Sequence, residues 1–337
     1  MKHFILDLQL FAEAIADANI TTSSGLPDEI KTFYEKTLIE LASPELVHDR
    51  FAQKKNIPAN AGTSIEFRKF APLTDDITAL VLKENEIPDG QALEETNVTG
   101  TIAVYGGYVK ISDKLELTAI DKVIVEATKK IAEQAGKTMD TITREKMMEG
   151  TNVYFVPAHG GTASETAVTK RESIVGAACY LRVKDIFRAA AILKGVDAKQ
   201  IDGAYIAIIH PNVAYDLMMG AGNAWIDITK YSKSEEIYDG EIGKIGGVRF
   251  IQSSQAKVLK GAGANGSNNV YVTFVIAKDA YATTGINGGE VEHIFHAKGE
   301  IGGPLNQYST VGWKGSKTAE ILHDDYLLRI ESGCTIG

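Results

Sequence analysis

The stretch SIEFRKF at residues 64–70 and the thirty residues APLTDDITALVLKENEIPDGQALEETNVTG at 71–100 decide the fold of this chain. Polar and apolar residues alternate from Ser64 to Phe67 and again along 102–111, which is the period of a β-strand. The residues between have no helical period and carry seven acidic side chains against a single lysine, Lys83. A loop this long is usually functional or disordered, and a two-stranded arm is marginally stable alone in water. The stretch therefore predicts an extended arm that lies on another surface.

A long amphipathic helix is predicted directly after this arm. Apolar residues recur at steps of three and four along 117–142, which is the period of a helix with one buried face. An extended arm that leads into a long helix favours a subunit whose surfaces are completed by its neighbours. The predicted stripe consists of Leu117, Ile120, Ile124, Ala127, Ile131, Ala135, Met139 and Ile142.

Two further helices are expected from start and stop signals. One runs from Asp28 to about Leu41, because Ser43 and Pro44 follow it, and the other runs from Ser173 to Leu193 and ends at Gly195. The rest of the chain predicts a mixture of helices and strands with many glycine turns.

The strands of this region are predicted from short apolar runs. Tyr205–Ile209 is continuously apolar, as in a buried strand, and Pro211 suits the first turn of a helix that continues to Met219. Further strands are expected at Val248–Ile251, at Val270–Ile276 and within Val291–Ile330, the last with turns at Gly302–Pro304 and Gly312.

Composition narrows the class of protein. The 337 residues are 44% apolar and 23% charged, which is typical of a soluble globular chain of about two domains. The net charge of −9 argues against a nucleic-acid reader, although it does not exclude a wall that encloses DNA.

Cys179 and Cys334 form no disulfide framework and fit a reducing cytosol. Met1–Leu10 is interpreted as a docking arm, with a signal peptide as the alternative, and no later stretch is an uninterrupted apolar span.

Three short strings carry a resemblance to a known family. Residues 8–12 read LQLFA, residues 208–211 read IIHP ahead of Leu217, and residues 240–248 read GEIGKIGGV. Together with the order of arm, long helix, α/β region and β-rich tail, they resemble the major capsid (coat) proteins of tailed bacteriophages of the N-four-like family. The resemblance extends over nearly the whole chain.

The resemblance implies an α+β protein with the Hong Kong-type coat fold. Its parts would be an N-terminal arm at 1–60, an extended loop at 61–112, a peripheral domain at 113–169 and 286–337 with a spine helix at about 114–149, and an apical α/β domain at 170–285.

The function that follows is structural: a major capsid protein that self-assembles, as hexamers and pentamers, into the icosahedral head that encloses phage double-stranded DNA. Made in the bacterial host cytoplasm from a phage or prophage gene, it would end in the virion.

A separate scaffolding protein is expected because few residues precede residue 28, and the resemblance also implies a portal and allows a decoration protein. Neither sequence-specific DNA binding nor a membrane partner is expected. Contacts between subunits are expected from the extended loop, at Leu80, Val81, Leu82, Lys83, Ile87 and Leu93.

Two other functions stay open. An encapsulin-like nanocompartment shell shares the fold and would hold a small enzyme cargo. A nucleotide-dependent oxidoreductase is the remote alternative, because residues 261–266 read GAGANG and match the dinucleotide pattern. That pattern needs a helix after it to receive a phosphate, whereas Val270–Ile276 predicts a strand, so a surface turn is the better interpretation. Gly136–Thr138 resembles the end of a phosphate-binding loop but lies inside the predicted long helix.

No catalytic residue, cofactor or metal is expected. His293 and His296 would lie on opposite faces of a strand, and His323 beside Asp324 and Asp325 has the same weakness as a metal site. Some capsids of this fold join subunits through a Lys–Asn bond assisted by a buried Glu. Lys83 is the one candidate lysine of the loop, and no motif supplies its partners.

Overall fold

The computed structural model describes residues 47–336 except 59–61, 71–72, 74–75, 78–79, 82–89, 119–122, 161–163, 223–224, 227–237, 239, 287–290 and 301–304. The predicted helix at Asp28–Leu41 and the predicted turn at Gly302–Pro304 lie outside these residues. The described chain divides into two compact units. The first contains residues 104–139 and 288–316, and the second contains residues 47–103, 140–287 and 317–336.

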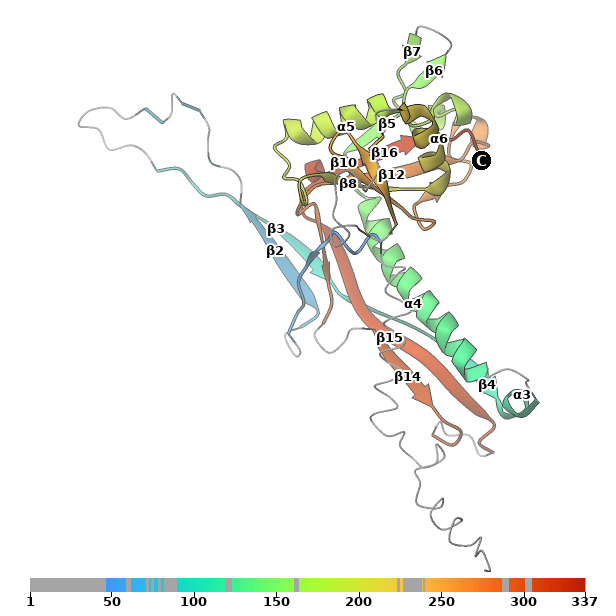
Figure 1. Cartoon of the computed structure of the whole chain (residues 1–337). Coiled ribbons are helices and arrows are strands. Elements are labelled where there is room, and N and C mark those ends of the chain that lie inside the picture. Colours follow the sequence, from blue (N-terminus) through green and yellow to red (C-terminus); the bar gives the residue numbers. More distant parts are fainter. Residues whose placement is uncertain are drawn as a thin grey trace, which may run out of the picture. The chain divides into compact units, whose positions relative to one another are not determined.

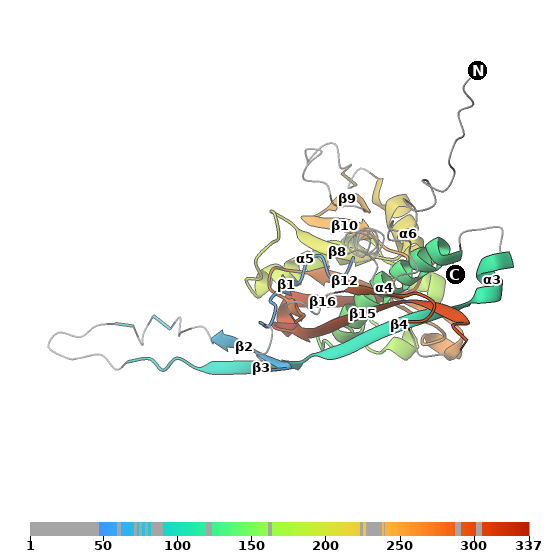
Figure 2. The same ribbon diagram turned by 90° about the horizontal axis from the view of Figure 1, so that it is seen from below.

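A seven-stranded sheet forms the centre of the second unit. Its strands lie in the order β5-β16-β12-β8-β10-β9, and β11 pairs with β12 outside this path. Figure 2 labels β9, β10, β8, β12 and β16 of this sheet. β10 pairs with β8 in parallel, whereas β12 pairs with β8 and with β16 in antiparallel fashion. The bounds are β5 Val153–Phe155, β8 Tyr205–Ile209, β9 Glu241–Ile245, β10 Val248–Gln252, β11 Val258–Leu259, β12 Val270–Ile276 and β16 Leu327–Ser332.

Both faces of this sheet are buried, which explains why β8 and β12 read as continuous apolar runs rather than as alternating ones. Tyr205, Ala207 and Ile209 belong to the core under α5 (Val183–Gly195) and α6 (Pro211–Ala221) (Figure 1). Ile208 faces the second core, with Phe274 and Met147. The predicted strands at 205–209 and 270–276 and the helix that begins at Pro211 are confirmed.

The helix predicted from Ser173 begins ten residues later, at Val183. Two short 3-10 turns, Arg171–Ser173 and Gly176–Ala178, occupy the preceding residues. The residue that follows each turn is bound by distant backbone, because Ala264 N donates to Ile174 O over 2.8 Å and Gly333 N donates to Cys179 O over 2.9 Å. The helix starts where Asp185 can accept the backbone N–H of Arg182 over 3.1 Å, which satisfies a donor at the helix N-terminus.

The extended arm is a hairpin of β2 (Ser64–Phe70) and β3 (Glu95–Thr101), paired in register from Ser64–Thr101 to Phe70–Glu95. The strand at 64–67 is confirmed. The return strand, however, is β3 and not the alternating residues 102–111, which form β4 (Ala103–Ser112) and pair with β15. β3 was missed because six of its seven residues are polar or glycine and it shows little apolar alternation.

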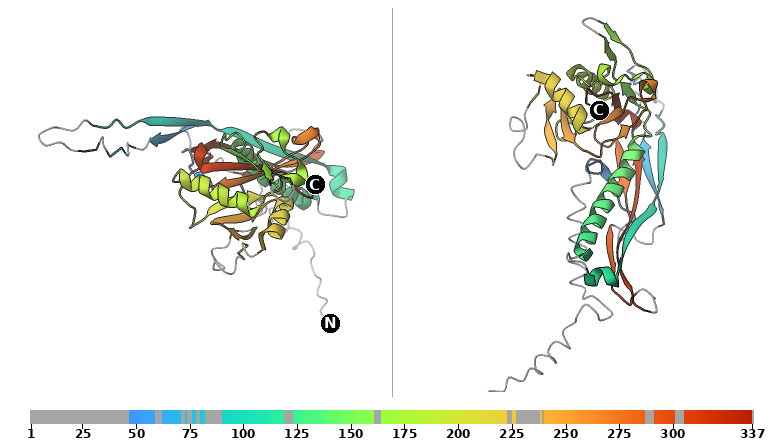
Figure 3. Two further views of the ribbon diagram at one scale, coloured as in Figure 1. Left: turned by 90° about the horizontal axis from the view of Figure 1, so that it is seen from above. Right: turned by 90° about the vertical axis from the view of Figure 1, so that its right-hand side faces the viewer.

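The long helix is α4, Val123–Met147, which Figure 3 shows as one uninterrupted green helix in its right-hand view. It begins later than predicted, and a separate short helix, α3 (Asp113–Thr118), precedes it. Ile131, Ala135 and Met139 of the predicted stripe are buried, whereas Leu117 on α3 is 77% exposed. Arg144 and Lys146 lie in the last turn of α4, where their positive charges interact favourably with the negative end of the helix dipole.

Beside α4, the first unit contains β4, β14 (Glu292–His296) and residues 308–316 of β15 (Tyr308–Ile321). β14 and β15 are antiparallel, with Ile294 opposite Gly312. Gly312 was predicted to be a turn but lies inside β15, because a residue without a side chain is needed there. A Cβ atom at Gly312 would lie 3.0 Å from Tyr108 Cβ and 3.1 Å from Gly107 O of β4.

Residues 47–58 belong to the compact second unit, although the prediction placed them in an N-terminal arm at 1–60. β1 (Gln53–Lys54) pairs in parallel with β13 (Tyr281–Thr284), and Ile57 forms a bridge with Ile286. β13 in turn pairs with residues 318–321 of β15. Small elements complete the chain: the strands β6 Ala158–Gly160 and β7 Ser164–Thr166, and the 3-10 turns Ala264–Gly266 and Asp324–Tyr326.

The prediction assigned residues 286–337 to the peripheral domain. β16, which lies within this range, belongs instead to the second unit. β16 lies between β5 and β12 in the seven-stranded sheet. Its Leu328 and Ile330 pack into the core shared with α5 and α6. The segment after it is also held there, since Thr335 N donates to Asp216 Oδ2 of α6 over 2.8 Å.

We expect Gly312→Ala to destabilise the folded chain by about 1–3 kcal/mol, because the new methyl group must displace the β4 backbone. The measurement is urea unfolding followed by circular dichroism. Gly195→Ala is the matched control, since a Cβ atom there meets nothing within 4 Å. An unchanged unfolding midpoint for Gly312→Ala would show that β4 and β15 do not approach as closely as described.

Candidate functional site

The base of the β2–β3 arm is packed on the second unit. Phe67 is buried, and the Lys55 ammonium lies 5.4 Å from the centre of its ring. Gly100 on β3 faces β15 so closely that a Cβ atom there would lie 2.9 Å from Glu320 Cγ. Arg68, the next residue of β2, forms an exposed ion pair across the hairpin, with its Nε 3.2 Å from Glu95 Oε1 of β3. The arm is therefore fixed at its base by burial on one face.

Beyond the base, the described part of the arm exposes large apolar side chains. Leu80, Val81 and Leu93, three of the predicted contact residues, are 51–63% exposed. Leu82, Lys83 and Ile87, the other three, lie outside the described residues. Three exposed side chains that the prediction missed are Phe70, Leu73 and Ile77.

We call the exposed set Phe70, Leu73, Ile77, Leu80, Val81 and Leu93 the arm patch. Apolar side chains gathered on one exposed segment indicate a protein–protein contact surface, in contrast to single exposed apolar residues. Acidic residues accompany the patch, including exposed Glu94. A partner for this segment would need apolar surface together with positive charge.

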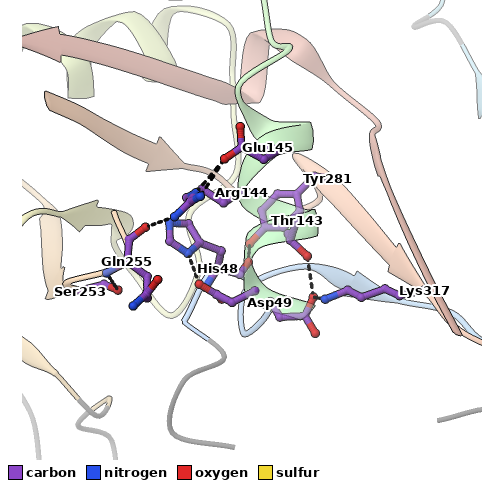
Figure 4. Close-up of polar contacts among 10 residues, drawn as sticks. His48, Asp49, Thr143, Arg144, Glu145, Ser253, Gln255, Tyr281 and Lys317 are labelled. Carbon is purple, nitrogen blue, oxygen red and sulfur yellow. Dashed lines mark hydrogen bonds and ion pairs between the residues drawn. The ribbon is translucent and has the colours of Figure 1, made fainter. Parts of the chain in front are cut away.

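A buried polar cluster fixes the first described residues to α4 and β13 (Figure 4). Asp140 accepts the backbone N–H of His48 over 2.7 Å, and its other oxygen lies 2.6 Å from His48 Nδ1. A carboxylate only accepts hydrogen bonds, so this ring nitrogen donates. Tyr281 donates its hydroxyl to His48 O. Burial, followed by the charges of Asp49 and Asp140, raises the pKa of Tyr281 well above its usual value, so that hydroxyl keeps its proton.

Asp49 extends this cluster toward β15. The Lys317 ammonium lies 2.7 Å from Asp49 Oδ1, and Thr143 donates to the same oxygen over 3.1 Å. Figure 4 shows this group beside a second one on α4, in which Arg144 donates to Gln255 O over 2.6 Å. Sequence reasoning missed both groups because their members lie up to 268 positions apart.

The other motifs of the sequence do not come together into a site. The GAGANG loop is followed by β12 and not by a helix, so it lacks the helix N-terminus that would receive a phosphate. Gly263 instead packs against backbone, since a Cβ atom there would lie 2.6 Å from Ile174 O. Gly136–Thr138 lies within α4.

The histidines and cysteines offer no metal chemistry in the described part of the chain, which contains no group of three potential ligands. His293 and His296 lie on β14, and His323 precedes the 3-10 turn at Asp324. Cys179 and Cys334 are free and buried. Burial raises the pKa of both thiols, that of Cys334 to about 12, so both stay protonated and unreactive at neutral pH.

Comparison with solved structures gives extensive likenesses at low sequence identity. The capsid of Ralstonia phage GP4 matches with a TM-score of 0.65 and 12% identity over 85% of this chain and 87% of that one. The Cyanophage Pam1 capsid matches with a TM-score of 0.59 and 14% identity over 87% and 94%. The holo-SrpI encapsulin complex of Synechococcus elongatus PCC 7942 matches with a TM-score of 0.52 and 10% identity over 97% and 96%.

The chain has the Hong Kong-type coat fold. No protein-family model matches the sequence, and no curated protein matches it either. None of the helices in the described residues is long and apolar enough to cross a membrane. At this level of identity the likenesses establish the fold, while the function has to be argued from the surfaces that the fold presents.

We expect Asp140→Asn to destabilise the folded chain by about 1–3 kcal/mol. The carboxylate now accepts hydrogen bonds from two N–H groups of His48, and the NH₂ group of the asparagine would face one of these donors. Thermal unfolding of the unassembled subunit measures this. The control is Glu149→Gln, an exposed partner of Lys146 whose loss should cost no more than about 0.5 kcal/mol. Equal melting temperatures for the two variants would contradict the role given to the His48 cluster.

Proposed function

We propose that this protein is a major capsid protein that assembles with copies of itself into the icosahedral head of a tailed bacteriophage. The observation that carries the proposal is the arm patch, a set of large exposed apolar side chains at the outer end of the β2–β3 hairpin and beyond it. A soluble monomer has no use for such a segment, whereas a shell built from many copies covers it in every copy. The coat fold supports this interpretation.

In this role the protein acts through association rather than through catalysis. The arm of one subunit would lie on a neighbour, and the resemblance implies that hexamers and pentamers are the units of assembly. Apolar contacts would supply most of the free energy of association, and complementary charge would fix register more than affinity. A separate scaffolding protein and a portal are expected partners, and a decoration protein is compatible with the same surfaces.

The enclosed cargo would be double-stranded DNA, held without recognition of its sequence. A net charge of −9 suits a wall that encloses DNA without binding it tightly, because tight binding of phosphates requires clustered Lys and Arg. The protein would be made in the cytoplasm of the host bacterium and end in the virion. We propose neither an enzymatic activity nor a cofactor.

A nanocompartment shell is the second candidate, since the encapsulin match covers 97% of this chain. TM-score does not separate the two functions, since the mature capsid of bacteriophage PhiM1 matches with the same value, 0.52, as the encapsulin. The two functions differ in what the shell holds, which is a genome in one case and a protein cargo in the other.

The proposal predicts that the recombinant protein forms shells, tubes or rings visible by electron microscopy. Scattering that reports a monomer at every protein and salt concentration would overturn it. Shells purified from the native host should contain nuclease-protected DNA. A defined enzyme in place of DNA would establish the nanocompartment instead.

Deletion of residues 73–92, with a short glycine-containing turn between β2 and β3, should leave a folded subunit that does not close a shell. The deleted segment contributes no buried side chain among its described residues, so its loss should barely change stability. Circular dichroism and a melting curve report the fold, and electron microscopy reports assembly. An unfolded variant would place the segment in a domain core, and normal shells would show that the arm does not join subunits.

A further inference from the structure

The exposed residues of α5 lie on one face of the helix and are mainly basic. Steps of three and four residues place them side by side, while Ile186, Ala189 and Leu193 on the opposite side are buried in the core. We call the exposed set Lys184, Phe187, Arg188, Ala191 and Lys194 the α5 face. Three of its five side chains carry a positive charge.

Acidic side chains do not balance this charge. Asp185 is the one acidic residue of α5, and it is buried, where it accepts the hydroxyl of Tyr154 over 2.7 Å. Glu165 lies 2.8 Å from Lys184 Nζ, and Asp197 is exposed just after the end of the helix. The α5 face is therefore a local excess of positive charge on a chain whose net charge is −9.

Most of the cations at α5 have no carboxylate partner among the described residues. The guanidinium carbon of Arg188 lies 5.0 Å from the centre of the Tyr154 ring, and Lys194 forms no ion pair with a described residue. Arg182, directly before the helix, has its guanidinium carbon 4.7 Å from the centre of the Tyr180 ring. A guanidinium over an aromatic ring keeps its full charge, so these groups can still attract an anion from outside the subunit.

Phe187, the one large apolar side chain of the α5 face, has a role inside the subunit. Its ring lies on the β9–β10 turn, because a Cβ atom at Gly246 would lie 2.9 Å from Phe187 Cδ1. A single exposed apolar residue of this kind does not indicate a docking surface. Charge, and not apolar area, is therefore the property that distinguishes the α5 face.

We propose that the α5 face contacts the phosphate backbone of double-stranded DNA. The inference rests on the function proposed above and adds the surface on which the enclosed DNA would lie. A DNA duplex carries one negative charge per about 1.7 Å of its axis. Lys184 and Lys194 are ten residues apart, about 15 Å along α5, so several phosphates lie within reach of the face.

Such a contact would be weak and free of sequence preference. Contacts to phosphate position a protein on DNA but read no bases. Each phosphate neutralised contributes about −0.9 to the slope of log K against log salt concentration, so a few cations give a modest slope. The net charge of −9 opposes the contact as a whole, which suits a cargo that is held loosely and must leave again.

Binding of a short random-sequence DNA duplex to the free subunit tests the contact. We expect fluorescence anisotropy to show binding at low salt that weakens as salt is added. Arg188→Glu together with Lys194→Glu should weaken binding roughly tenfold and make the salt slope shallower by about 2. The matched control is Lys129→Glu with Lys130→Glu on α4, which changes the net charge equally at exposed lysines paired with Glu126 and Glu133 and should keep the wild-type slope.

Three results of this experiment would overturn the inference. They are no binding by the wild type at low salt, equal losses of affinity and slope in the two variants, and equally tight binding of polyglutamate that is lost in the same variant. The last result would assign the α5 face to an acidic protein segment instead of DNA.

Acetylation of lysines tests the contact in the assembled particle. Lys194 is exposed on the subunit, and we expect it to react in free subunits and in shells emptied of DNA but to be protected in DNA-filled heads. Protection already in empty shells would place the α5 face between subunits, and full reactivity in filled heads would show that DNA does not lie on it. Either result overturns the inference and leaves the proposed function intact, whereas particles that never hold DNA would overturn that function.

Discussion

The structure depends on a division of apolar side chains between those the chain can bury and those it cannot. β8 and β12 lie in the middle of a sheet with cores on both faces, and their residues are almost wholly buried. The arm patch has no such cover, because a two-stranded hairpin provides only one neighbour for each strand. The base of the arm, in contrast, is covered, because Phe67 is buried there.

The base of the arm and residues 47–49 are both held in place within the second unit, but by different interactions. Phe67 is fixed by burial, whereas His48 is fixed by hydrogen bonds to Asp140 and Tyr281 in a site closed to water. Replacement of a buried ion pair by apolar side chains is often neutral for stability, whereas removal of one partner is costly because it leaves the other unpaired. The polar cluster therefore specifies where residues 47–49 lie on α4 more than it strengthens the fold.

Elements with a strong local signal could be predicted from the sequence, and the rest could not. The apolar runs of β8 and β12 and the proline before α6 gave their elements almost to the residue. β3 escaped because its side chains are polar, and Gly312 misled because a glycine that allows two strands to approach looks the same in sequence as one in a turn. Three of the predicted contact residues, Leu80, Val81 and Leu93, are exposed as a contact surface requires. A groove of about 530 Å³ lined by Tyr108 and Tyr308 could not be predicted, since these residues are brought together by the pairing of β4 with β15.

The position of β16 has a consequence for how the protein is made. β16 lies between β5 and β12, and its residues are joined to theirs by backbone hydrogen bonds along both edges. Until residue 332 has left the ribosome, β5 and β12 each keep an open edge and the apolar core beneath α5 is incomplete. A nascent or prematurely terminated chain thus lacks a finished second unit. Translation as far as residue 332 is therefore required before the seven-stranded sheet is complete.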